Sequence, residues 1–165
     1  VVTGDALCVG YGLAIAGEKG LGFLVNFVDT LLGCGGVLVG DGGDNASTTT
    51  FDQVLKQAQA SNAAIYTVAV IDPLERDANP RLLTRLAVAT GGESFFPRDV
   101  DAVGEVLQGI ADDIRHSYTL GYVSSNPARD GRFRRIGIVV TDSARRSLRV
   151  RTRDGYRAGG PLLGS

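Results

Sequence analysis

Hydrophobic residues follow one spacing in the middle of this chain and another in its last third. Between residues 51 and 115, three segments have apolar residues three or four positions apart, the spacing of one helical face. Short runs rich in apolar residues stand before and between these segments, at Val37–Val39, Ala63–Ile71 and Glu93–Phe96. Because such runs are typical of buried strands, we expect an α/β fold with a parallel sheet and helices on both faces.

Capping residues bound each predicted helix. Ser47 and the three threonines after it offer N-caps for the first helix, and Asn62 marks its end. Asn79–Pro80 predicts the start of the second helix and Gly91–Gly92 its end, because proline fits the first helical turn and glycine the C-cap. The third helix is expected at Asp99–Arg115. The predicted apolar faces contain Phe51, Val54, Leu55, Ala58, Leu82, Leu83, Leu86, Ala87, Val103, Val106, Leu107, Ile110 and Ile114.

The last third of the chain predicts a C-terminal antiparallel β extension. Its strand-like runs are Tyr118–Val123, Phe133–Val140 and Ser147–Thr152, with turn residues between them. In the last run, apolar residues and threonine alternate with arginines, which predicts an edge strand with one buried face and one charged face. The two alternating sets are Leu148, Val150 and Thr152, and Arg149, Arg151 and Arg153.

The first forty residues carry ten glycines, which weakens any prediction of regular structure there. Asp5–Ala16 is compatible with a helix of small residues. Leu21–Val28 fits a buried strand or a helix that continues through Leu32. We therefore divide the chain into a glycine-rich N-terminal segment of residues 1–36, an α/β core of residues 37–116, the antiparallel extension of residues 117–158 and a tail of residues 159–165.

The N-terminal segment also bears on location. The chain begins abruptly at Val1 without the basic residues of a signal peptide, which indicates a cut within a longer protein. Residues 21–39 are apolar, but Asn26, Asp29 and four glycines argue against a membrane span, since a central aspartate costs about 2.5–3.5 kcal/mol. Cys8 and Cys34 allow one disulfide, and two buried thiols fit at least as well.

Charge is distributed unevenly. From Arg115 onward there are eleven arginines and three aspartates, a balance of +8, whereas residues 1–114 have a balance of -9. The two halves can attract one another within the fold, present opposite faces to partners, or spread their charges over a solvated surface. We do not expect a nucleic-acid partner, because few aromatic residues lie between the arginines and the chain as a whole is slightly acidic.

The best site candidate follows the first predicted strand of the core. Asp41 stands where that strand ends, in a turn that Gly42 and Gly43 allow to be sharp. Ligands of parallel α/β sheets bind beyond such strand ends, so Asp41 is a candidate ligand for a metal or an anchor for a partner. The alternative is a turn aspartate that caps the next helix, together with the neighbouring Asp44 and Asn45.

Other candidates are weaker. His116 is the single histidine and stands at a predicted helix end, where a cation complements the helix dipole. Tyr118 and Tyr122 are expected to share a strand face and to pack on the last helix. The turn that starts at Asp130 is either a solvated hairpin or a surface whose arginines dock an acidic partner. Those arginines are Arg132, Arg134 and Arg135.

Several motifs resemble one known family. Val39-Gly-Asp-Gly-Gly-Asp-Asn-Ala-Ser47, then Ala64-Ile-Tyr-Thr-Val68, then Leu86-Ala-Val-Ala-Thr-Gly-Gly-Glu-Ser-Phe-Phe-Pro97 resemble a von Willebrand factor type A domain. The continuation resembles the related branch found widely in acidobacterial proteins. It consists of Ile114–Tyr122, Asn126–Phe133 and Arg153–Tyr156, so the resemblance covers residues 37–158.

The resemblance implies a Rossmann-like, doubly wound sheet with a metal-ion-dependent adhesion site at its carboxyl edge. That site takes ligands from an Asp-x-Ser-x-Ser segment, a threonine loop and the aspartate of a Ser/Thr-Asp-Gly turn. Asp41 matches the last, but Gly40 replaces the hydroxyl residue and the chain contains no Asp-x-Ser-x-Ser. Thr3 or Asp5 is a distant match to the threonine loop. Since Mg²⁺ or Mn²⁺ needs more ligands than Asp41 provides, the site is incomplete unless another segment or chain completes it.

These observations favour a non-enzymatic domain that binds a protein partner or neighbouring subunits, with Asp44 and Asn45 beside Asp41 and the arginines after Asp130 as contact candidates. One rival is a scaffold subunit of a larger complex. A hydrolase or nucleotide-binding domain ranks lower, because the sequence has no Gly-x-x-x-x-Gly-Lys-Ser/Thr and no Gly-x-Ser-x-Gly motif. The resemblance alone implies an extracytoplasmic location.

Overall fold

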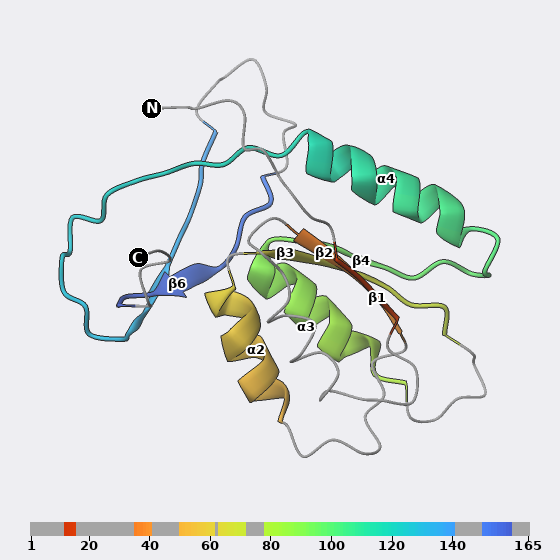
Figure 1. Cartoon of the computed structure of the whole chain (residues 1–165), viewed down its shortest axis with the longest axis horizontal. Helices are drawn as coiled ribbons and strands as arrows, with labels where there is room; N and C mark the ends of the chain where they lie inside the picture. Colours follow the sequence, from red (N-terminus) through yellow and green to blue (C-terminus); the bar gives the residue numbers. More distant parts are fainter. Residues whose placement is uncertain are drawn as a thin grey trace.

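A parallel sheet with helices beside it lies at the middle of the computed structural model, which describes residues 12–15, 35–40, 50–61, 63–71, 78–140 and 150–159 (Figure 1). Within these residues the strands pair in the order β1-β2-β3-β4, all parallel. A separate antiparallel pair, β5–β6, follows later in the chain. The fold is therefore mixed α/β. The strands of the parallel sheet are β1 (Gly12–Ile15), β2 (Gly35–Val39), β3 (Ala64–Val68) and β4 (Ser94–Phe95).

Helix α2 (Phe51–Ala60) begins where the cap signals predict. The Thr50 hydroxyl accepts a hydrogen bond from the Gln53 N–H at 3.4 Å, and the Gln53 side-chain oxygen accepts one from the Thr50 N–H at 2.8 Å. This capping box satisfies backbone donors that a helix N-terminus leaves open. The helix ends at Ser61, one residue before the predicted Asn62, which lies outside the described residues.

Helix α3 (Pro80–Thr90) also has its predicted ends. Pro80 occupies its first turn, and Gly91 ends it in the left-handed conformation with φ 88°. Gly92 is needed for a different reason, because a Cβ there would stand 2.0 Å from the Ile65 carbonyl oxygen. Gly91 and Gly92 thus stop the helix and let the chain run close to β3.

Helix α4 (Val103–Arg115) is shorter than the predicted Asp99–Arg115. The Asp99 carboxylate accepts a hydrogen bond from the Ala102 N–H at 2.9 Å. That bond belongs to a turn before the helix, because short polar side chains compete for backbone donors. The predicted helix end at Arg115 is confirmed.

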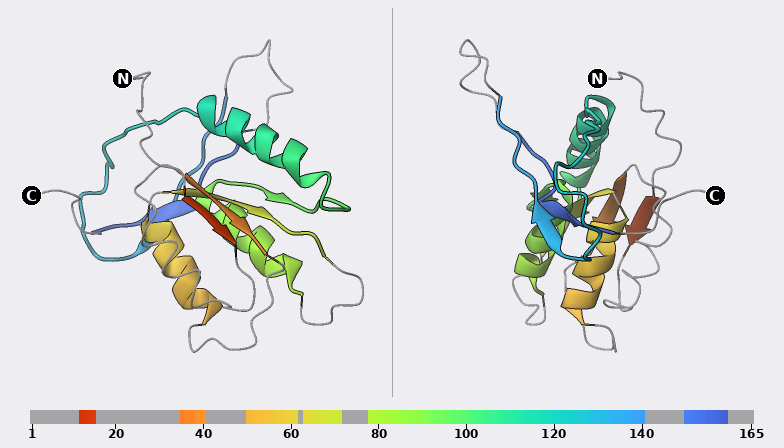
Figure 2. Two further views of the ribbon diagram at one scale, coloured as in Figure 1. Left: turned by 45° about the vertical axis from the view of Figure 1, so that its right-hand side comes forward. Right: turned by 90° about the vertical axis from the view of Figure 1, so that its left-hand side faces the viewer.

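The sheet is covered on both faces (Figure 2). Along β3, Ile65 packs in the cluster that α2 and α3 share, whereas Tyr66 and Val68 pack in the cluster that α4 completes through Ile110. Successive residues of a strand point to opposite faces, so a strand between two helical layers is mostly apolar; the buried hydroxyl of Thr67 donates a hydrogen bond of 2.7 Å to the Ser94 hydroxyl. The buried strand predicted within Ala63–Ile71 is confirmed.

The C-terminal strands differ from the prediction. Strands β5 (Phe133–Arg135) and β6 (Gly155–Arg157) form an antiparallel pair that is separate from the parallel sheet. Tyr118–Val123 contains no strand, and the run from Phe133 to Val140 is a strand only at its start. The ladder ends with the hydrogen bond from the Ile136 N–H to the Asp154 carbonyl oxygen, 2.9 Å long. An antiparallel pair in this region was correctly predicted. Its second strand was wrong, because β6 begins after the predicted run Ser147–Thr152, and so was its attachment to the parallel sheet.

The predicted edge strand with a buried apolar face and a charged outer face was also wrong for its described residues. Val150 is 39% exposed, and residues 150–152 are not in a strand. The side chain of Arg151 is only 28% exposed and reaches the α/β core. Arg151 turns inward because the carboxylates of Glu93 and Asp113 neutralise its charge, whereas Arg149 lies outside the described residues.

At the N-terminal end, β1 shows that Gly12–Ile15 is a strand and not the end of a helix through Asp5–Ala16. It pairs in parallel with β2, from Gly12 beside Gly36 to Ile15 beside Val39. Glycine is a poor helix former, and pairing with β2 supplies backbone partners instead. The predictions for Leu21–Val28, Cys8 and Cys34 lie outside the described residues. Among those described, no helix combines the length and the apolar composition that crossing a bilayer requires.

Candidate functional site

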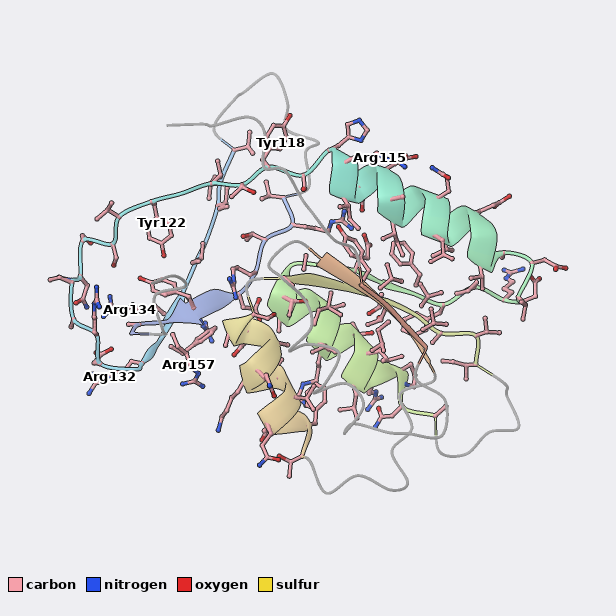
Figure 3. All side chains as sticks on the ribbon, viewed as in Figure 1. Arg115, Tyr118, Tyr122, Arg132, Arg134 and Arg157 are labelled. Atoms are coloured by element: carbon pink, nitrogen blue, oxygen red, sulfur yellow. The ribbon has the colours of Figure 1, made fainter. Side chains whose placement is uncertain are left out.

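The arginines of the described C-terminal region fall into two groups. Some turn inward and bind groups of the fold, and others project from the β5–β6 pair toward solvent (Figure 3). The inward group comprises Arg134, Arg151 and Arg153, and the outward group at the strand pair comprises Arg132, Arg135 and Arg157. The division is one of exposure, since Arg157 still donates a hydrogen bond of 3.4 Å to the Gly131 carbonyl oxygen and Arg132 lies 3.8 Å from Asp130.

Arg151 joins the C-terminal region to the α/β core. Its guanidinium forms ion pairs with the carboxylates of Glu93 and Asp113, and it lies 5.8 Å from the centroid of the Tyr66 ring. Burial lowers the pKa of Arg151, but the hydrogen bond to Asp113 and the nearby negative charges outweigh burial and raise the pKa above its usual range. Burial raises the pKa of the Tyr66 phenol, and the charge of Arg151 opposes that rise.

Arg153 makes a second link to the core. Its guanidinium donates a hydrogen bond to the Gln59 carbonyl oxygen near the C-terminal end of α2. A cation at that end complements the helix dipole. Burial lowers the pKa of Arg153, yet the guanidinium stays protonated at neutral pH because the usual pKa of arginine lies far above 7.

Arg134 organises the loop that precedes β5. Its guanidinium donates hydrogen bonds of 2.6 Å to the carbonyl oxygens of Asn126 and Ala128. It also lies 3.6 Å from the Asp130 carboxylate, and its side chain is only 16% exposed. This side chain is engaged within its own loop, so it is a poor candidate for contact with a partner.

A tyrosine pair lies on the same side of the strand pair as Arg134. The rings of Tyr122 and Tyr156 meet edge to face with centroids 6.1 Å apart. The pKa of Tyr156 is lowered by its hydrogen bond with Ser124 and, less strongly, by its hydrogen bond with Tyr122. The same hydrogen bond between the two tyrosines raises the pKa of Tyr122. The prediction that Tyr118 and Tyr122 share a strand face on the last helix was wrong. Tyr118 is 84% exposed, and Tyr122 packs on β6 because no strand forms beneath it.

The opposite side of the strand pair carries the exposed cations. Phe133 lies across from Arg157 and Arg135 across from Gly155, so the side chains of Phe133, Arg135 and Arg157 share one face. The ring of Phe133 covers Gly155, where a Cβ would stand 2.8 Å from the ring carbon Cζ. We call the exposed side chains of Phe133, Arg135 and Arg157 the ribbon face.

The predicted site residues are therefore separated. Arg132, Arg134 and Arg135 all lie at β5, but Arg135 belongs to the ribbon face and Arg134 to the opposite one. Arg132 projects beside the strand with its side chain 84% exposed, 3.8 Å from Asp130. The remaining predicted residues, Asp41, Asp44 and Asn45, lie outside the described residues.

No group of three or more metal-binding side chains occurs among the residues that the structure describes. His116 stands at the C-terminal end of α4, as predicted, with Nδ1 2.7 Å from the Asp112 carbonyl oxygen. Just before Asp41, the Gly40 N–H donates a hydrogen bond of 3.1 Å to the Val68 carbonyl oxygen. The chain thus leaves β2 at the carboxyl end of the sheet, beside the end of β3.

Sequence reasoning did not single out Phe133, Arg157 or the carboxylates that bind Arg151. One signal was present, because two Asp-Gly pairs at Asp130 and Asp154 each precede an arginine- or aromatic-rich triplet. The partners of Arg151 stand 58 and 38 residues before it, and nothing local indicates them.

No protein-family model matches this chain, and no curated protein matches it. Among solved structures, the crystal structure of an uncharacterized membrane-spanning protein from Vibrio fischeri is similar, with 25% sequence identity and a TM-score of 0.43. The similarity covers 59% of this chain and 55% of that one, so this chain spans about half the length of the Vibrio protein.

Proposed function

We propose that this chain is a non-enzymatic domain of the von Willebrand factor type A kind, with a Rossmann-like doubly wound core, that binds an acidic protein partner through its exposed arginines. The parallel strands and the helices on both faces support this proposal. The motifs between Val39 and Pro97 that resemble the family support it as well. The same resemblance underlies our proposal that the protein works outside the cytoplasm.

One observation carries the proposal. The side chains of Arg132, Arg135 and Arg157 are exposed. The contacts of two of them are long: Arg132 lies 3.8 Å from Asp130, and Arg157 donates a hydrogen bond of 3.4 Å to the Gly131 carbonyl oxygen. Arg134 and Arg151 are less exposed and bind groups of the fold at shorter range. Exposed charges add little to stability, typically about 0–1 kcal/mol. Their usual contribution is to the rate and selectivity with which an oppositely charged partner is bound.

The metal site of the family does not fit the residues present. Gly40 offers no hydroxyl, and Asp41 alone cannot satisfy a six-coordinate divalent ion. We therefore propose that the adhesion site is incomplete and that the partner is bound without a metal bridge. Calorimetric titration of Mg²⁺ and Mn²⁺ into the EDTA-treated protein tests this, with Asp41→Ala as the control. Saturable binding that this substitution abolishes would contradict the proposal.

Photo-crosslinking tests the protein interaction. A benzophenone analogue of phenylalanine replaces Phe133 in the full protein, in its native cells, and the crosslinked partner is identified by mass spectrometry. We expect the partner to present carboxylates at the crosslink and to be lost from the R132Q/R135Q/R157Q variant. R115Q is the matched control, since Arg115 is an exposed arginine on α4, away from the strand pair (Figure 3). Equal crosslinking by the triple variant would refute the role of these arginines.

A structural observation favours a second function, that of a scaffold subunit. Apolar side chains are exposed along two extended segments, with Tyr118 84%, Val123 96% and Val139 82% exposed. Exposed apolar groups of this kind indicate burial in an assembly. The two functions differ in their response to salt: binding through arginines weakens at high ionic strength, and burial of apolar surface does not. Salt-resistant co-purification of the partner would favour the scaffold.

A further inference from the structure

The hydrogen bonds of the strand pair determine which backbone groups face outward. The Ala158 N–H donates to the Arg132 carbonyl oxygen at 3.0 Å, and the Ile136 N–H donates to the Asp154 carbonyl oxygen at 2.9 Å. In an antiparallel pair, residues that exchange hydrogen bonds alternate with residues that do not. Phe133 and Arg135 fall at the alternate positions, so their N–H and C=O groups point away from β6.

This outer edge of β5 is open among the residues that the structure describes. No backbone hydrogen bond between described residues engages the N–H or C=O groups of Phe133 and Arg135 on that side. Helix α2 lies beside β6, so the opposite edge of the pair belongs to β5 (Figure 2). An unpaired strand edge is a template for one more strand.

The charges around this edge select its occupant. Residues 132–135 read Arg-Phe-Arg-Arg, so pairing with the same edge of a second copy would place arginines opposite arginines. Like charges opposite one another on neighbouring strands are destabilising. A strand with an acidic side chain beside Arg135 and an apolar side chain beside Phe133, which is 36% exposed, complements the edge.

A nucleic acid fits the edge less well than a peptide. The outward groups of Phe133 and Arg135 include donors and acceptors in alternation, and a peptide backbone offers both. A phosphodiester backbone offers acceptors only, so it leaves the outward carbonyl oxygens without partners.

We propose that the outer edge of β5 accepts an extended acidic segment of a partner protein as a third strand. Its backbone pairs with Phe133 and Arg135, an acidic residue faces Arg135, and an apolar residue two positions away packs against Phe133. Arg157 strengthens the attraction from the neighbouring strand of the ribbon face. This inference rests on the proposed function, because it assigns the binding mode of the same partner.

A designed peptide tests the binding mode. The probe is fluorescein-labelled Thr-Glu-Thr-Val-Thr-Glu-Thr-Val-Thr, measured by fluorescence anisotropy against the full protein. R135P removes the outward N–H without breaking the ladder to β6, and R135Q removes only the charge. R115Q is again the matched control. A probe with alternate backbone nitrogens methylated makes the same test on the unmodified protein, so the result does not depend on the folding of R135P.

We expect R135P and the methylated probe each to weaken binding at least tenfold, R135Q to weaken it about two- to fivefold, and R115Q to leave it unchanged. Equal binding of the methylated probe, or of a probe with lysine in place of glutamate, would overturn the inference. So would displacement of the probe by a single-stranded oligonucleotide that R135P still binds, or a dimer of the protein that R135P abolishes.

The two proposals fail separately. If the peptide does not bind at millimolar concentration while the R132Q/R135Q/R157Q variant still loses its crosslinked partner, strand addition is refuted and the interaction through arginines stands. If the triple variant also keeps its partner, both are refuted.

Discussion

The α/β core and the β5–β6 pair use polar residues in opposite ways. In the core, the hydroxyl of Thr90 is buried and accepts a hydrogen bond from the Ile65 N–H at 3.0 Å, so a polar group serves the packing around it. At the strand pair, Arg135 and Arg157 are exposed and have apolar Phe133 between them. In the core a buried polar group is satisfied within the fold, whereas the strand pair leaves charged groups exposed to solvent.

The largest expected effect comes from the core. Ile65, a residue of β3, is fully buried against the helices α2 and α3, so Ile65→Ala removes apolar contacts and leaves a cavity. We expect a loss of about 2–5 kcal/mol in the free energy of unfolding, measured by urea denaturation. A loss below 1 kcal/mol would mean that this cluster does not act as a packed core.

Two glycine-to-alanine substitutions compare a position in close backbone contact with an open one. Gly92→Ala places a Cβ 2.0 Å from the Ile65 carbonyl oxygen, and we expect a loss of about 1–3 kcal/mol. Gly109→Ala, in the interior of α4, meets nothing within 4 Å and is expected to stabilise the protein by about 0.5–1 kcal/mol. Urea denaturation of both variants measures the difference, and equal effects would contradict the close approach at Gly92.

The link between the two regions is expected to be intermediate. Arg151→Gln removes the cation that Glu93 and Asp113 share, and we expect a loss of about 1.5–3 kcal/mol. R115Q breaks the exposed pair with Asp112, for which about 0.3–0.5 kcal/mol is expected. Thermal unfolding of both variants at the same salt concentration tests the ranking. If the two losses were equal, Arg151 would be an ordinary surface charge.

Tyr66 adds a pH dependence to the core. Its pKa is raised above 10.0 by burial, so the unfolded chain ionises first as the pH rises. The neutral phenol therefore contributes its full share to the free energy of unfolding below about pH 10, and this share is lost as the pH rises through the raised pKa. We expect Tyr66→Phe to flatten the fall of stability above pH 10. Tyr118→Phe is the control, since Tyr118 is 84% exposed, and an unchanged slope in Tyr66→Phe would refute the assignment.

The smallest effect on stability is expected at the exposed arginines of the strand pair. The R132Q/R135Q/R157Q variant changes exposed side chains only, so its free energy of unfolding should stay within about 0.5 kcal/mol of the unmodified protein. Circular dichroism during urea denaturation provides the value. A large loss would show that these arginines support the fold and would remove the contrast between the two regions.

Local signals account for most of what the sequence predicted correctly. A threonine N-cap at Thr50, Pro80 in a first turn and Gly91 at a C-cap each act over a few residues, and all are in place. The buried strand around Ile65 was equally predictable, because an apolar run needs cover on both faces.

Long-range pairing accounts for most of the errors. The alternation around Arg151 indicated two faces, but groups distant in the sequence turn the arginines inward: two carboxylates for Arg151, and the Gln59 carbonyl oxygen for Arg153. In the same way, the sequence grouped Arg134 with Arg135, although successive strand residues point to opposite faces. Arg134 instead donates a hydrogen bond to the Asn126 carbonyl oxygen in the loop before β5. The structure places Arg132, Arg134 and Arg135 at β5 but on different sides of it, and their role in binding a partner stays a prediction.

The attachment of Arg151 to α4 and to the residue before β4 has a consequence for proteolysis. The chain leaves the core after Arg115, and residues 117–123 are exposed throughout, so they are accessible to a protease. A cut there lies between two anchored points, since Arg151 still holds Glu93 and Asp113. The nicked protein should therefore elute from a size-exclusion column as a single species. Its two fragments should separate only when denaturant breaks the ion pairs of Arg151.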